Sequence, residues 1–242
     1  MEFYSKIYRR LLKKNNSIED VLGEKKLNRI GKDLKYLDNN GYNYGIKKLN
    51  IDDLKCFYEH IYKPEIEKKA NSKTTDLVSK YSPRLDSEQI FFAHISQGEK
   101  IIGGEIIILK DNKLMLSFKS NIDHFKNELK SGIGLLLDYL FLYYGFNNLE
   151  FDFFSYGKDR NCYGELGAGI GLALYKLRLN FTPFISETDG KTNIDNNSLS
   201  NPTLVFFPTG DNGECKKIGI KNIEKQTDLE FLKEKGFELL NL

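Results

Sequence analysis

In the first third of the chain, apolar residues recur at spacings of three and four, the period of an amphipathic helix. The clearest stretch covers residues 27–37, after a capped start at residues 17–20. Residues 42–49 alternate weakly and predict a short strand, and residues 50–53 cap a second helix. Residues 1 to about 70 are therefore expected to be mainly helical.

The middle of the chain changes to the pattern of strands. Apolar runs cover residues 90–95, 101–109 and 114–119, and short polar turns separate them. Two tight turns between apolar runs predict an antiparallel meander. The polar residues 71–88, which precede these runs, are expected to form a loop.

After the meander the period changes back to that of helices. The turn Gly132-Ile133-Gly134 leads into an apolar helix at residues 135–144 that Gly145 ends, and residues 149–154 predict the next strand. Because a helix between two strands of one sheet makes a right-handed crossover, these strands are expected to be parallel. The remaining predicted elements are a glycine-rich loop, a helix, an exposed loop, a strand and a terminal helix, at residues 164–171, 172–179, 186–201, 202–207 and 228–239.

The composition is that of a folded protein without a strong charge bias. The 242 residues are 40% hydrophobic and carry 36 Lys and Arg against 34 Asp and Glu, a net charge of +2. That balance disfavours a dedicated binder of duplex nucleic acid, which needs a basic excess to contact phosphates. We expect a single unit over residues 1–242, with a helical portion at 1–88, the core sheet at 89–210 and a C-terminal tail and helix at 211–242.

Cysteines, histidines and apolar stretches narrow the class further. The 3 cysteines lie far apart and suit a reducing compartment, and the 3 histidines are too dispersed to predict a metal site. The most apolar stretch, residues 133–144, is shorter than the roughly 20 residues of a membrane span. Residues 1–14 lack the apolar segment of an export signal. We therefore expect a cytoplasmic protein without a membrane span.

The order of these elements resembles the GNAT acyltransferase superfamily, and more closely the branch of FemAB-like and polysaccharide-cluster acetyltransferases. Residues 130–137 are similar to the superfamily's pyrophosphate turn, and residues 144–152 are similar to its helix end, glycine and strand. Residues 174–181 resemble the aromatic, basic and Phe closure of the FemAB-like helix. Residues 25–38 and 58–64 add weaker similarity, so the resemblance runs in order from residue 25 to residue 183.

This resemblance implies an α/β (α+β) fold with a GNAT-like mixed sheet, in which an antiparallel meander is joined to parallel crossover strands and flanked by helices. It implies an N-acyltransferase that uses acetyl-CoA, or another acyl-CoA, as co-substrate. The acceptor would be a small amine such as an amino sugar nucleotide of polysaccharide biosynthesis or an amino acid. The resemblance does not determine the oligomeric state, and a homodimer is one of the states that stay open.

The Gly-x-Gly turn is where the resemblance implies contact with the CoA pyrophosphate. A helix N-terminus offers unpaired N–H groups and the positive end of the helix dipole, and glycines let phosphate oxygens approach the backbone. Lys126 lies nearby and adds positive charge. The superfamily usually has Arg or Gln at the position of Leu129, so a purely structural turn is the alternative. The candidate cofactor-binding residues are Leu129, Lys130, Ser131, Gly132, Ile133 and Gly134.

Acyl transfer to an amine needs a proton acceptor and a donor for the leaving thiolate. Glu105 lies among isoleucines in a strand, where burial would raise its pKa, unless it points outward on the polar side. Asp152 is expected at the carboxyl end of a parallel strand, where ligands of α/β sheets bind, against the alternative of a solvated acid. Tyr175 resembles the tyrosine that the family uses near the thiol, although an aromatic residue on such a helix also suits a core.

The second glycine cluster and the helix after it supply the candidate acceptor site. Gly167 and Gly169 are candidates for shaping the acceptor pocket, with a merely flexible loop as the alternative. Nucleotide hydrolysis is disfavoured, because this loop lacks the Lys-Ser/Thr of a nucleotide-hydrolysing loop. Arg178 would bind a phosphate or carboxylate, with a surface salt bridge as the alternative. Two other functions stay open: a FemAB-like transferase that uses aminoacyl-tRNA, and a catalytically silent binding module with the same fold.

Overall fold

The computed structural model describes residues 2–14, 16–68, 74–122, 128–164, 169–185, 190–193, 195, 197, 199, 201–210 and 212–242. The chain forms two compact units: the core unit, residues 12–154, and the split unit, residues 1–11 with 155–242. These boundaries differ from the expected portions 1–88, 89–210 and 211–242. They fall inside the strands β2 (Lys6–Leu12) and β7 (Phe153–Arg160), because the N-terminal strands pair with C-terminal ones.

The helical start of the core unit is confirmed in most of its details. Helix α1 (Ile18–Leu22) begins with a capping box, in which the Ser17 hydroxyl accepts from the Asp20 amide and the Asp20 carboxylate accepts from the Ser17 amide. Gly23, at φ 72°, separates α1 from α2 (Glu24–Asn39). Helix α2 buries an apolar face that includes Ile30 and Leu37.

The sheet of the core unit contains the predicted meander. Its strands lie in the order β3 (Tyr42–Lys48), β4 (Gln89–Gln97), β5 (Lys100–Lys110) and β6 (Lys113–Asn121). All three neighbouring pairs are antiparallel. The predicted strands at residues 42–49, 90–95, 101–109 and 114–119 are therefore confirmed.

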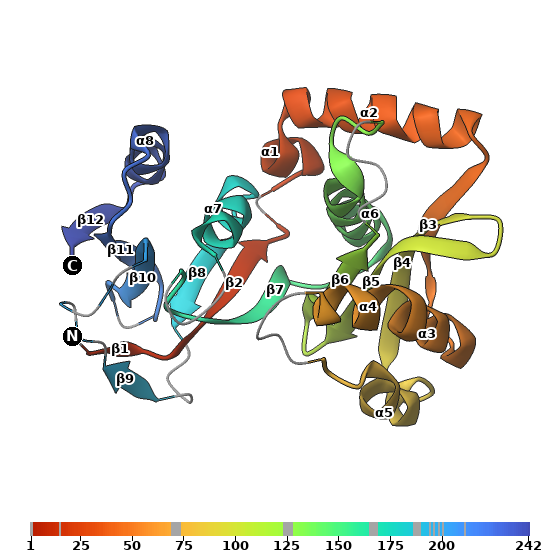
Figure 1. Ribbon diagram of the computed structural model, residues 1–242, viewed down its shortest axis with the longest axis horizontal. Coiled ribbons are helices and arrows are strands. Elements are labelled where there is room, and N and C mark those ends of the chain that lie inside the picture. The colour runs from red at the N-terminus through yellow and green to blue at the C-terminus, as the bar shows by residue number, and fades with distance from the viewer. Residues whose placement is uncertain are drawn as a thin grey trace. The chain divides into compact units, whose positions relative to one another are not determined.

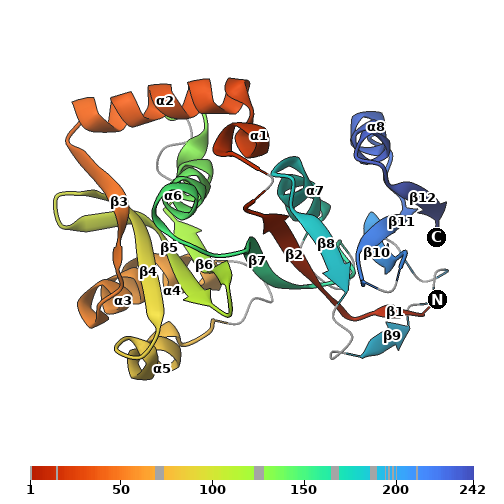
Figure 2. The same ribbon diagram turned by 180° about the vertical axis from the view of Figure 1, so that it is seen from behind.

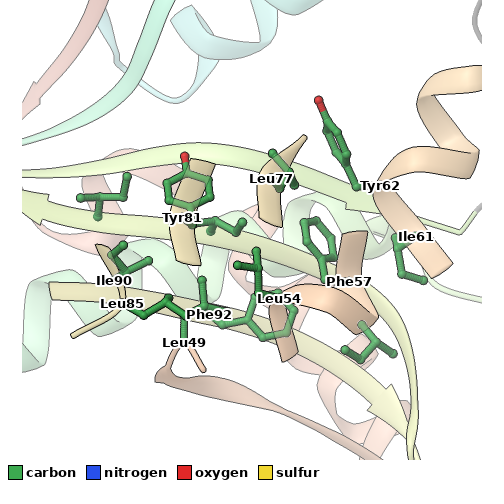
Figure 3. Packing of buried hydrophobic residues seen from close by; sticks show 13 residues of the cluster. Leu49, Leu54, Phe57, Ile61, Tyr62, Leu77, Tyr81, Leu85, Ile90 and Phe92 are labelled. Atoms are coloured by element: carbon green, nitrogen blue, oxygen red, sulfur yellow. The ribbon is translucent and has the colours of Figure 1, made fainter. Parts of the chain in front are cut away.

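Short helices pack on one face of this sheet and close an apolar core (Figure 3). They are α3 (Ile51–Phe57), the π-helix η1 (Tyr58–Tyr62), α4 (Lys63–Glu67), α5 (Leu77–Tyr81) and the 3-10 helix η2 (Ser82–Arg84). The expectation of a loop over residues 71–88 is wrong for residues 77–84. Asp76 caps α5 there, and the packed side chains of Leu77 and Tyr81 are fully buried.

Helix α6 (Gly132–Asn148) packs against β4, β5 and β6 (Figures 1 and 2). It is longer than predicted, because Gly145 does not end it. A Cβ at Gly145 would lie 2.4 Å from Cε1 of Phe154 and 2.8 Å from Cδ2 of Leu114, so this glycine permits a close approach inside the helix. The next strand, β7, begins at Phe153 rather than at the predicted residue 149.

The split unit contains strands that the sequence analysis missed. The charged N-terminus forms β1 (Glu2–Tyr4) and β2 instead of helix. Strands β7, β2 and β8 (Thr182–Ile185) are neighbours in that order, and β2 is antiparallel to β8. Strand β1 is antiparallel to β9 (Lys191–Asn193), which lies in the segment expected to be a loop.

The C-terminal part of the split unit is a second small sheet. Strands β10 (Thr203–Pro208) and β11 (Cys215–Lys221) are antiparallel, and β12 (Glu238–Asn241) is parallel to β11. Helix α7 (Ile170–Arg178) is confirmed, whereas the terminal helix α8 (Gln226–Glu234) ends earlier than predicted. The chain thus has a mixed α/β fold with antiparallel and parallel strand pairs flanked by helices. Among the described helices, none has the length and apolarity to cross a membrane.

Candidate functional site

The turn before α6 is held by a carboxylate from α2. Asp33, which is 2% exposed, accepts hydrogen bonds from the Lys130 amide at 2.9 Å, from the Ser131 amide at 2.6 Å and from the Ser131 hydroxyl. These N–H groups belong to the residues expected to contact a pyrophosphate. Because these N–H groups already donate to Asp33, the backbone of Lys130 and Ser131 cannot donate to a phosphate in this conformation.

The next residues of the turn remain open. A Cβ at Gly132, whose φ is 75°, would meet nothing within 4 Å, and one at Gly134 would meet only Asn121 Oδ1 at 3.9 Å. The side chains of Leu129 and Ile133 are buried, so these two residues can contact a ligand only through their backbone. The space that a close-approaching anion needs is therefore at Gly132 and Gly134.

A cluster of charged side chains lies beneath the first turns of α6. Lys119 Nζ, on β6, lies 2.7 Å from both carboxylate oxygens of Asp138 and 3.3 Å from the carbonyl oxygen of Gly134. Glu105, on β5, is directly opposite Lys119 in the strand register. Asp138 and Glu105 are fully buried, and 22% of the Lys119 side chain is exposed.

Glu105 faces α6, so the alternative that it points outward to solvent is wrong. Gly103, two residues earlier on the same face, approaches Ile133 and Leu137 of α6, whereas Gly104 approaches Phe57 and Phe92 on the opposite face. Neither carboxyl oxygen of Glu105 has a hydrogen-bond partner among the described residues. Burial raises the pKa of Glu105 well above its usual value and the Asp138 charge raises it further, whereas the Lys119 ammonium acts in the opposite direction.

Asp152 lies before its strand and not at the carboxyl end. Its backbone donates to the Asn112 carbonyl at 2.8 Å and accepts from the Lys13 amide at 2.9 Å. The residue is exposed and lines a hollow of about 680 Å³ in the core unit, together with Lys13, Glu150 and Phe151. The expectation that Asp152 lies at the carboxyl end of a strand is wrong, because β7 begins one residue after it.

The remaining candidates, which are Tyr175, Arg178, Gly167 and Gly169, belong to the split unit. Tyr175 is half-buried on α7, and Arg178 Nη2 lies 2.9 Å from Asp228 Oδ1 of α8, which is the salt bridge given as the alternative for this residue. Gly169 is exposed at the start of α7. Gly167 lies outside the described residues, as do Lys126 and His124.

The sequence analysis missed a buried polar network in the split unit. Arg9 is fully buried, its guanidinium carbon lies 4.3 Å from the centre of the Phe206 ring, and its Nη2 donates to the Tyr163 hydroxyl at 3.2 Å. The hydroxyl donates to Asp159 Oδ2 at 2.7 Å, and Lys176 Nζ lies 2.7 Å from the same oxygen. Burial raises the pKa of Tyr163 above its usual value. Helix α7 thus brings Lys176, the residue after Tyr175, into this network.

Three residues of the core unit that the sequence analysis did not select complete its site. Asp33 and Asp138 are acids inside otherwise amphipathic or apolar helical stretches, and Lys119 ends an apolar strand run. An acid at a position where the helical period expects an apolar residue was the available signal. In the part of the chain that the structure describes, no three His, Cys, Asp or Glu residues are grouped so that they could hold a metal ion.

Of the comparisons with known proteins, the one with solved structures shows the class of fold. The sequence matches no protein-family model, and no curated protein is significantly similar to it. Among solved structures, the chain is similar to acyltransferases of GNAT-like fold. The sequence identities to the structures described next are 11–15%, and identities this low show a shared fold and nothing further.

One solved structure with a similar fold is FemX, with a TM-score of 0.55 at 12% identity, over 76% of this chain and 60% of FemX. The L-PGS of Bacillus licheniformis matches with a TM-score of 0.40 at 11% identity, over 74% of this chain and 53% of that one. The ribosomal-protein-S18-alanine N-acetyltransferase of Escherichia coli has a TM-score of 0.32 at 15% identity, over 72% of this chain and 89% of that one. This chain thus spans about half to three fifths of the length of FemX and L-PGS.

Proposed function

We propose that this protein is an acyltransferase that moves an acyl group, most often acetyl, from an acyl-CoA to a small amine. The observation that carries the proposal is the open glycine turn at the start of the long apolar helix α6, in a fold similar to that of FemX. The amide groups from Gly132 to Gly134 and the positive end of the α6 dipole would bind the pyrophosphate. Acceptors in keeping with the proposal are an amino sugar nucleotide or an amino acid, in the cytoplasm.

The proposed chemistry needs proton transfer as well as binding. Direct attack of the amine on the thioester would proceed while both substrates are held together, which supplies much of the acceleration. Glu105 stays a prediction as the proton acceptor. Its oxygens are enclosed without a hydrogen-bond partner among the described residues, and burial favours its protonated form, so it would have to lose that proton before it could accept one. Asp152 and Tyr175 stay predictions as catalytic residues, and Arg178, Gly167 and Gly169 stay predictions for the acceptor site.

A thermal-shift measurement tests the proposed donor. At about a hundredfold excess over the dissociation constant, acetyl-CoA should stabilise the protein by about 2.7 kcal/mol, which raises Tm by about 5–10 °C for a chain of this size. A panel of amines with acetyl-CoA should then release a free thiol. The absence of any shift with CoA thioesters would refute the proposed donor, and a shift without thiol release on any amine would favour a silent binding module.

A variant of the glycine turn separates binding from architecture. Gly134 has an ordinary helical conformation with room for a Cβ, so Gly134→Val should change the free energy of unfolding by less than about 1 kcal/mol. It should nevertheless weaken acetyl-CoA binding at least about tenfold, because the branched side chain would occupy the space of the phosphate oxygens. Unchanged affinity in the folded variant would show that the turn is only architecture.

The likeness to FemX supports a second candidate, in which the donor is an aminoacyl-tRNA, as in the FemAB-like enzymes that the sequence resembles. The two candidates differ in two measurements. An aminoacyl-tRNA donor predicts transfer of a radiolabelled amino acid from charged tRNA and no thermal shift with acetyl-CoA. The CoA proposal predicts a thermal shift with acetyl-CoA and no transfer of an amino acid from charged tRNA.

A further inference from the structure

The exposed side of α2 carries a group of cations beside the α6 turn. Lys25, Arg29 and Lys32 follow one another at spacings of four and three residues, so they share a helix face. Together with Lys130 they line an open groove of about 530 Å³, which Asn28 and Glu24 complete. We call this the α2 groove.

The cations of the α2 groove differ in their partners from several other basic residues of the protein. Lys47, Lys176 and Lys217, for example, are paired with Asp53, Asp159 and Glu238. No carboxylate among the described residues forms an ion pair with any of the four groove cations. In a chain whose charges nearly cancel, this concentration of unpaired positive charge marks a site for an anion.

The groove adjoins the turn that the proposed function assigns to the pyrophosphate. Asp33 accepts from the backbone amides of Lys130 and Ser131, which fixes the start of α6 against α2. Figures 1 and 2 both show α2 alongside the start of α6. Lys130 therefore belongs to the groove through its side chain and to the turn through its backbone, so the groove and the turn can receive two phosphate groups of one ligand.

The size of the groove indicates what kind of ligand carries those phosphates. A volume of about 530 Å³ is in the range of small-molecule sites. A net charge of +2 does not suit an extended contact with RNA. CoA carries a pyrophosphate on the 5′ oxygen and a phosphate monoester on the 3′ oxygen of one ribose. The monoester bears a charge near −2 at neutral pH, which matches a group of unpaired cations.

We propose that the α2 groove binds the 3′-phosphate of CoA and that Arg29 and Lys32 make the donor site select CoA over dephospho-CoA. This inference rests on the proposed function, since it adds a second phosphate site to the same donor. Guanidinium and ammonium groups donate charge-assisted hydrogen bonds to phosphate oxygens, and solvent screens them here because the groove is open. Each side chain is therefore expected to change the affinity by a moderate factor.

Calorimetric titration of the full chain with CoA and with dephospho-CoA tests this inference, because the two ligands differ only in the 3′-phosphate. The wild type should bind CoA at least about tenfold more tightly. Arg29→Ala and Lys32→Ala should each weaken CoA binding about three- to tenfold and leave dephospho-CoA binding unchanged. Lys35→Ala, which removes an exposed cation of α2 outside the groove, is the matched control and should change neither affinity.

All three substitutions place alanine at exposed helical positions, so the variants are expected to fold, which circular dichroism verifies. Equal affinity of the wild type for CoA and dephospho-CoA would overturn this inference and leave the proposed function standing. Equal weakening of both ligands in Arg29→Ala would overturn it as well. If neither ligand binds, both the inference and the proposed function are overturned. Loss of binding to a tRNA in Arg29→Ala, with CoA binding unchanged, would assign the groove to RNA and overturn it.

Discussion

The buried carboxyl group of Glu105 predicts a specific dependence of stability on pH. Both of its oxygens are enclosed without a hydrogen-bond partner in the described chain, and burial raises its pKa well above the usual value of 4.5. Between pH 4.5 and the raised pKa, the folded protein therefore holds a proton that the unfolded chain has released. The contribution of this proton to stability is complete below pH 4.5 and is lost as the pH rises toward the folded-state pKa.

The magnitude follows from linkage. Each pH unit between 4.5 and the raised pKa removes about 1.4 kcal/mol from the free energy of unfolding. Glu105→Met has a similar volume and no ionisable group, so its stability should lack this loss. The gain of the variant over the wild type should begin at about 1–3 kcal/mol at pH 5, because two unsatisfied polar atoms are removed, and should increase with pH.

The assay is chemical denaturation at pH 5, 6, 7 and 8, followed by circular dichroism because the chain has no tryptophan. Glu105→Gln should also lack the pH dependence but gain less stability, since the buried amide is still polar. Glu99→Gln, at an exposed position in the turn before β5, is the control and should follow the wild type. If wild type and Glu105→Met lose stability in parallel from pH 5 to pH 7, Glu105 does not hold a proton in the folded state and the reasoning fails.

Further predictions concern the close contacts around α6. Asp33→Ala should lower the free energy of unfolding by about 2–3 kcal/mol, measured by chemical denaturation, because it leaves the amides of Lys130 and Ser131 without their charged acceptor; a loss below about 0.5 kcal/mol would contradict the role of Asp33 as the anchor of the turn. Gly145→Ala should destabilise the protein by about 1–3 kcal/mol despite the better helix propensity of alanine, because the Cβ would meet the Phe154 ring at 2.4 Å. Gly31→Ala is the matched helical substitution in open space and should stabilise by about 0.5–1 kcal/mol; equal effects of the two would show that packing at Gly145 does not decide the outcome.

Local patterns in the sequence were sufficient for much of the core unit. Ser17 and Asp20 cap α1 through their own neighbours, and the meander β4 to β6 follows from apolar runs with tight turns. The cap and the meander both depend on interactions between residues close in sequence, so they can be predicted without knowledge of the fold. The burial of Glu105 among isoleucines was also predictable, although which face it occupies was not.

Contacts between residues far apart in the chain decided the rest. The charged stretch at residues 6–12 is a strand because it pairs with β8, which lies about 175 residues later in the sequence. Ile7 is opposite Ile185 in this pair. Gly145 continues α6 because Phe154 and Leu114 pack against it, whereas by itself a glycine predicts an end. Asp33 reaches Lys130 and Ser131 across nearly a hundred residues.

The sequence alone determined the helical and strand periods, the glycine turn before α6 and the acid within β5. Only the tertiary structure decided that a carboxylate from α2 holds that turn, that Lys119 and Asp138 lie with Glu105 beneath α6, and that unpaired cations gather in the α2 groove. The physical reason is that hydrogen bonds, ion pairs and burial depend on distance in space, and a pattern along the chain reports distance only between residues within a few turns of each other.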